Sequence, residues 1–134
     1  MSRENVDIVR RIYTEGLIFH DPERLVAELA TPDIEYVNPP YAVEPGIRRG
    51  PAEVGQALRR AHELFATPRY VVDQLFDGGD SVVAAVRFHA HGRGSESEAV
   101  QEAVHTWTLR DGRISRFEWG FNLDEALEAV GLSE

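Results

Sequence analysis

Residues Tyr70 to Phe121 read YVVDQLFDGGDSVVAAVRFHAHGRGSESEAVQEAVHTWTLRDGRISRFEWGF and predict four consecutive β-strands. We expect these strands over Tyr70–Asp77, Ser81–His91, Glu98–Arg110 and Arg113–Phe121. Gly78-Gly79 and Asp111-Gly112 lie at two of the joints and favour tight hairpins, because turns that match sheet twist need positive φ. An eleven-residue strand spans roughly 36 Å, which is long for a small domain. Such strands must twist and curl, so the remaining helices can cover the concave side and enclose a pocket.

Three helices are expected before this run and one after it. Val6, Val9, Tyr13 and Leu17 recur at helical spacing and share one face of the first helix. The pair Asp21-Pro22 begins a second helix, and Gly50-Pro51 begins a third. The closing helix starts with Asn122-x-x-Glu125, a variant of the capping box.

A short strand, Ile34–Asn38, is expected between the second and third helices, with Ile34, Tyr36 and Asn38 on one side. An irregular loop follows from Pro39 to Gly50 and serves either as a lid over a pocket or as a plain connection. The helices are segregated from an antiparallel sheet, so the expected fold class is α+β, in a single domain over residues 1–134.

Composition limits the partners. The net charge of −9 argues against nucleic acid, which usually binds a basic face. The absence of cysteine excludes disulfides and thiolate metal sites. No segment is long and apolar enough for a signal peptide or a membrane span. We therefore expect a cytoplasmic protein with no nucleic-acid or membrane partner.

Several phrases, in this order and spacing, resemble SnoaL-like and ketosteroid-isomerase-like proteins of the nuclear-transport-factor-2-like superfamily. The phrases are VRRIYTEGL (9–17), HDPERLVAELA (20–30), DIEYVNPP (33–40), RRGPAEV (48–54) and HTWTLRDGRISRFEW (105–119). The resemblance covers nearly the whole chain. It implies a cone-shaped half-barrel, an apolar cavity closed by the N-terminal helices, and a homodimer formed through the outer face of the sheet.

Ketosteroid isomerases place a tyrosine, a proton-moving aspartate and a second, neutral acid in that cavity. By the resemblance, Tyr13 matches the tyrosine, but Asn38 and His105 stand where the two acids are expected. An amide cannot take up a proton at neutral pH, so the isomerase reaction by that mechanism is not expected. His105 is instead the candidate general base or acid, with Tyr13 and Asn38 positioning a substrate oxygen. In the alternative without a site, Tyr13 and His105 are core residues bonded to their neighbours, and Asn38 only stabilises the turn that follows it.

Five aromatic residues are the candidate ligand-binding wall of the cavity. They are Tyr36, Trp107, Phe117, Trp119 and Phe121. Facing inward together, they suit a flat apolar ligand; the alternative is a packed core without free volume.

A rival pattern, His89-x-His91 followed by Glu96, echoes part of a cupin metal motif. The glycines of that motif and its second half are missing, so we expect no metal and no cofactor, and a polar strand end instead.

The sequence thus favours a SnoaL-like protein that binds a small apolar organic molecule. It is either a cofactor-free acid–base enzyme of the isomerase, cyclase or dehydratase type, or a non-catalytic ligand-binding or dimeric interaction module.

Overall fold

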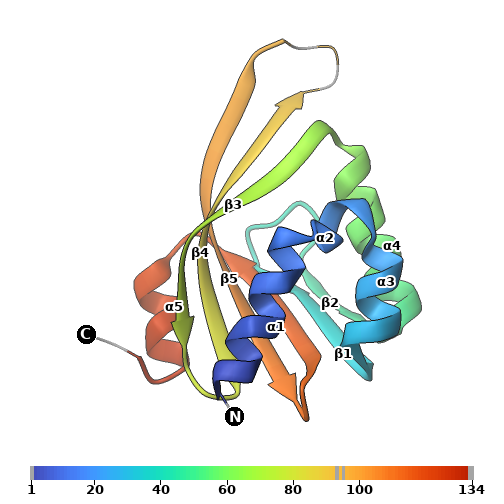
Figure 1. Cartoon of the computed structure of the whole chain (residues 1–134). Helices are drawn as coiled ribbons and strands as arrows, with labels where there is room; N and C mark the ends of the chain where they lie inside the picture. The colour runs from blue at the N-terminus through green and yellow to red at the C-terminus, as the bar shows by residue number, and fades with distance from the viewer. Residues whose placement is uncertain (1, 93, 95, 133–134) are drawn as a thin grey trace.

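A curved six-stranded sheet with helices on its concave side forms the framework of the computed structural model, which describes residues 2–92, 94 and 96–132 (Figure 1). The helical segments are α1 (Ser2–Thr14), α2 (Leu17–His20), α3 (Pro22–Arg24), the π-helix η1 (Leu25–Leu29), α4 (Gly50–Glu63) and α5 (Leu123–Ala129). The strands are β1 (Ala30–Asn38), β2 (Gly46–Arg49), β3 (Phe65–Asp77), β4 (Ser81–Gly92), β5 (Glu98–Arg110) and β6 (Arg113–Gly120). The α+β class and the cone-shaped, unclosed sheet are confirmed.

The strands lie in the order β2-β1-β6-β5-β4-β3. All neighbours are antiparallel except β1 and β6, which run parallel. Register shifts in β3, between Val72 and Gln74, and in β5, between Thr108 and Leu109, add local bending. The two predicted hairpins are confirmed, with positive φ at Gly79 (85°) in one turn. The other turn has positive φ at Asp111 (53°) and Gly112 (77°).

Several strand boundaries differ from the sequence prediction. β1 starts at Ala30 and β3 at Phe65, and each strand runs through a proline, Pro32 or Pro68, that lies within a register shift. The segment expected to be wholly irregular between Pro39 and Gly50 contains β2, which pairs with β1. The last strand ends at Gly120, one residue earlier than predicted.

Side chains cap the predicted helix starts at Asp21 and Asn122. The backbone N–H of Arg24 donates to Asp21 Oδ1 at 3.2 Å, and the backbone N–H of Glu125 donates to Asn122 Oδ1 at 3.0 Å. These caps satisfy N–H groups that a helix start leaves without an internal partner.

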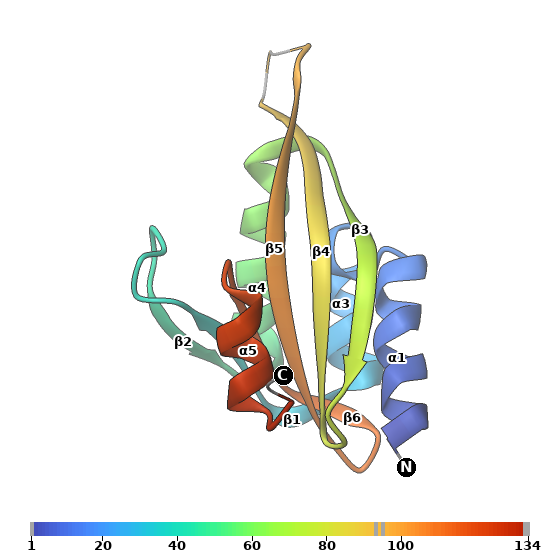
Figure 2. The same cartoon turned by 90° about the vertical axis from the view of Figure 1, so that its left-hand side faces the viewer.

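The two faces of the sheet bury different sets of side chains. On the concave face the core joins α1, α2, η1 and α4 to the strands, through residues such as Val9, Ile12, Ile34, Val54 and Trp107. On the convex face α5 covers a smaller cluster that includes Val83, Val104 and Leu127 (Figure 2). Because four helical segments cover the concave face, a site can be enclosed there.

None of the helices in the described ranges is long and apolar enough to cross a membrane.

Candidate functional site

Tyr13 of α1 and His105 of β5 meet inside the cone. The Tyr13 hydroxyl lies 2.5 Å from His105 Nδ1, and Trp107 Nε1 donates to the same hydroxyl oxygen at 2.8 Å. The direction of the Tyr13–His105 bond follows the imidazole tautomer: with the ring hydrogen on Nε2, the phenol donates its proton to Nδ1. Residues remote in sequence thus form one hydrogen-bonded chain, Trp107–Tyr13–His105.

Burial keeps this pair uncharged. His105 is 1% exposed, and burial lowers its pKa to about 3. Burial also raises the pKa of Tyr13 well above its ordinary value, more than the hydrogen bond from Trp107 lowers it. Near pH 7 the pair is therefore a neutral phenol bonded to a neutral imidazole.

Aromatic rings surround His105. The Tyr70 and Phe117 rings stand edge-on to it, with centroids 4.6 Å and 5.0 Å away. Phe117 stacks on Trp107 at 4.2 Å and on Tyr36 at 5.4 Å. Trp107 and Phe117, two of the expected ligand-binding residues, are thus buried in this cluster.

Asn38 is engaged elsewhere. Its Oδ1 accepts from Trp119 Nε1 at 2.6 Å, and its Nδ2 donates to the Glu44 carbonyl at 2.8 Å. These bonds tie the end of β1 to β6 and to the loop before β2. The structure therefore joins Tyr13 and His105 directly and places the amide of Asn38 with Trp119 instead.

A cavity of about 470 Å³, called here the Trp119 pocket, opens where α4, the β1–β2 loop and the start of β3 meet. It is lined by Tyr36, Asn38, Ala42, Val43, Glu44, Arg48, Ala57, Arg60, Ala61, Leu64, Phe65 and Trp119. Tyr36 and Trp119 are the expected wall residues that line it. Phe121 lies outside the wall, because β6 ends before it; its side chain is 52% exposed and stacks on Tyr41 at 5.7 Å.

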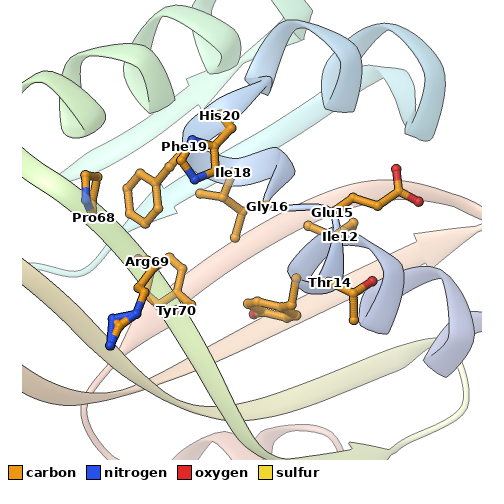
Figure 3. A pocket seen from close by; sticks show the side chains of 11 residues that line it. Ile12, Thr14, Glu15, Gly16, Ile18, Phe19, His20, Pro68, Arg69 and Tyr70 are labelled. Carbon is orange, nitrogen blue, oxygen red and sulfur yellow. The ribbon is translucent and has the colours of Figure 1, made fainter.

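A second cavity of about 260 Å³, the Tyr13 pocket, lies between the α1–α2 junction and β3. Figure 3 shows Ile12 and Thr14 on one side and Pro68 and Tyr70 on the other. Sequence reasoning did not identify this pocket. The only hint of it in the sequence is Gly16, a residue that tolerates positive φ. In the structure Gly16 has a φ of 64° and separates α1 from α2.

The histidines of the rival metal pattern have separate partners. His89 Nδ1 lies 3.2 Å from Glu98 Oε1, whereas His91 Nδ1 lies 3.0 Å from Thr67 Oγ1. Glu96 is exposed. Across residues 2–92, 94 and 96–132, no three His, Cys, Asp or Glu residues are grouped closely enough to hold a metal ion.

The curved sheet covered by helices and the two cavities place this chain among small cone-shaped proteins that contain cavities. A family model described as a SnoaL-like domain matches residues 9–117, so the chain belongs to the SnoaL-like family. No curated protein matches it.

Solved structures share the fold. A putative SnoaL-like polyketide cyclase from Jannaschia sp. CCS1 is 21% identical, with a TM-score of 0.77, and covers 98% of this chain and 94% of that one. TerC co-crystallized with polyporic acid is 24% identical, with a TM-score of 0.74 and coverages of 95% and 98%. A hypothetical protein with a ketosteroid isomerase-like fold from Catenulispora acidiphila DSM 44928, in complex with trimethylamine, is 17% identical, with a TM-score of 0.73 and coverages of 93% and 92%. At these identities the likeness shows the fold.

Proposed function

We propose that this SnoaL-like protein binds a small, flat, largely apolar organic molecule in the Trp119 pocket. The observation that carries the proposal is the lining of that pocket. Trp119, Tyr36 and Phe65 supply aromatic surface, and Ala57 and Ala61 of α4 supply aliphatic surface. The volume of about 470 Å³ lies within the usual range for small-molecule sites, roughly 300–1,000 Å³.

The structures of similar fold support small organic ligands as the class. TerC was crystallized with polyporic acid, and the Catenulispora acidiphila protein with trimethylamine. The polar groups that line the pocket then orient the ligand.

The test is a fluorescence titration with N-phenylnaphthylamine, a neutral aromatic dye that brightens in apolar surroundings. Ala61→Trp fills the pocket from α4, whereas Ala52→Trp adds the same side chain at an exposed position of the same helix that does not line the pocket. We expect saturable binding to the native protein and to Ala52→Trp, with at least tenfold weaker binding to Ala61→Trp. Equal binding to the two variants contradicts the proposal.

A second candidate function is cofactor-free acid–base catalysis on a carbonyl compound: isomerisation, cyclisation or dehydration. It is favoured by the 2.5 Å contact between Tyr13 and His105 and by the place of Tyr13 in the wall of the Tyr13 pocket. In this reaction the Tyr13 hydroxyl turns from Nδ1 to donate a hydrogen bond to the substrate oxygen on which negative charge develops. Nδ1 of His105, released from the phenol, takes up the proton that leaves the substrate carbon.

The test of catalysis uses the compound that co-purifies with the protein or is found by screening. Tyr13→Phe and His105→Asn are expected to lower kcat by roughly 100-fold or more while leaving dye binding in the Trp119 pocket unchanged. Unaltered turnover in both variants removes the catalytic role.

Assembly as a homodimer is a further part of the proposal. Tyr41 and Phe121 are 61% and 52% exposed and lie beside the groove that α5 leaves on the convex side of the sheet. Light scattering is expected to give twice the 15.0 kDa mass of the chain, and a mass of one chain across micromolar concentrations contradicts it.

A further inference from the structure

Three charged residues line the Trp119 pocket among those the structure describes there: Arg48, Arg60 and Glu44. Arg48 lies 3.6 Å and Arg60 3.9 Å from Glu44 Oε1. One carboxylate thus faces two guanidinium groups, which leaves the pocket wall with one net positive charge in a protein whose overall charge is −9.

Arg48 lies deepest of the three. Its side chain is 23% exposed, against 56% for Arg60 and 64% for Glu44. Burial raises the pKa of Tyr36 in the aromatic wall to about 12, and the hydrogen bond with Trp119 and then the positive charge of Arg48 lower it. The positive charge therefore acts inside the pocket.

The ion pairs that Arg48 and Arg60 make with Glu44 are weak, so another anion can replace the Glu44 carboxylate. Both exceed 3.5 Å, and Glu44 is mostly exposed, so each contributes little to stability. By contrast, the neighbouring Arg59 of α4 makes a two-pronged pair with Glu23. A ligand anion that replaces Glu44 would gain charge-assisted hydrogen bonds from two guanidinium groups beside an apolar surface.

We infer that the ligand of the Trp119 pocket is an organic anion, a flat aromatic body that carries one acidic group held by Arg48 and Arg60 while Glu44 turns away. This inference rests on the proposed function. It assigns the acidic group to the β2 and α4 side of the pocket and the apolar body to Trp119, Tyr36 and Phe65. The overall negative charge opposes any anion at long range, so a preference for anions must come from these two residues.

The test compares N-phenylnaphthylamine with anilinonaphthalene sulfonate, which adds one sulfonate to the same body. The native protein is expected to bind the sulfonate about tenfold more tightly than the neutral dye, the equivalent of one charge-assisted hydrogen bond. Arg48→Gln removes most of this preference, because it weakens binding of the sulfonate far more than binding of the neutral dye. Arg60→Gln has a smaller effect in the same direction, and Glu44→Gln increases the preference. Arg59→Gln, the matched control on α4, changes neither affinity.

The outcomes separate the two proposals. If both dyes bind with equal affinity, or if Arg48→Gln and Arg59→Gln behave alike, the ligand is not selected by charge and this inference is overturned, while binding in the pocket stands. If neither dye binds the native protein, the proposed function itself is overturned. An increase in sulfonate affinity in Glu44→Gln that is absent when Arg48 is also replaced supports the exchange of Glu44 for the ligand.

Discussion

Replacing the buried imidazole of His105 should change how the stability of the protein depends on pH. His105 is neutral in the folded protein because burial lowers its pKa to about 3, whereas in the unfolded chain its pKa returns to about 6.5. Below pH 6.5 the unfolded chain therefore takes up a proton that the folded protein cannot. The stability contributed by this site is present in full above pH 6.5 and is lost progressively as the pH falls from 6.5 toward 3.

The expected magnitude follows from the two pKa values. At pH 5, which is 1.5 units below 6.5, protonation of the unfolded chain lowers the free energy of unfolding by about 2 kcal/mol. At pH 7 the same effect is only about 0.2 kcal/mol. His105→Asn offers an amide oxygen in place of Nδ1 to the Tyr13 hydroxyl and does not titrate, so it removes this loss.

Urea unfolding of the native protein and of His105→Asn at pH 7 and pH 5 measures the difference directly. The other histidines are present in both proteins, so their contributions cancel. We expect the free energy of unfolding of the native protein to fall by about 2 kcal/mol more than that of the variant between the two pH values. An equal fall in both proteins would refute the reasoning, because it would mean that His105 titrates normally in the folded state.

Three further changes test the account of the framework. Tyr13→Phe leaves His105 Nδ1 and Trp107 Nε1 without the phenol and should cost about 3 kcal/mol; a loss below about 1 kcal/mol in urea unfolding speaks against the hydrogen-bonded chain. Asn122→Ala removes the cap of α5 and should cost about 1 kcal/mol, with Asn122→Asp nearly neutral; calorimetry that finds the two variants alike argues against the cap. Gly79→Ala, at a φ of 85°, should cost about 1 kcal/mol through backbone strain alone, and an unchanged melting temperature would contradict that turn geometry.

The parts of the fold that depend on local chemistry could be predicted from the sequence. The glycines at the Gly78-Gly79 turn and the caps at Asp21 and Asn122 act within a few residues of their positions. β2 could not be predicted, because it exists only through its pairing with β1. The extended starts of β1 and β3 were missed for a related reason: register shifts absorb Pro32 and Pro68, and such shifts depend on the partner strand.

The candidate site was predictable only in part. The family resemblance pointed to Tyr13 and His105, which the structure joins by a hydrogen bond. The partner of Asn38 was not predictable, since Trp119 reaches it only through the parallel pairing of β1 with β6. Arg48 was not predicted as a site residue, because the segment that carries it was interpreted as a loop, whereas it belongs to β2.

The most direct measurement of the central claim uses the two tryptophans of the chain as reporters. Trp119 lines the Trp119 pocket, whereas the indole N–H of Trp107 is buried against Tyr13. In ¹⁵N-labelled protein titrated with anilinonaphthalene sulfonate, the indole signal of Trp119, assigned with Trp119→Phe, is expected to shift in a saturable way while that of Trp107 stays nearly fixed. A shift confined to Trp107, or no shift in either signal, would contradict binding in the pocket.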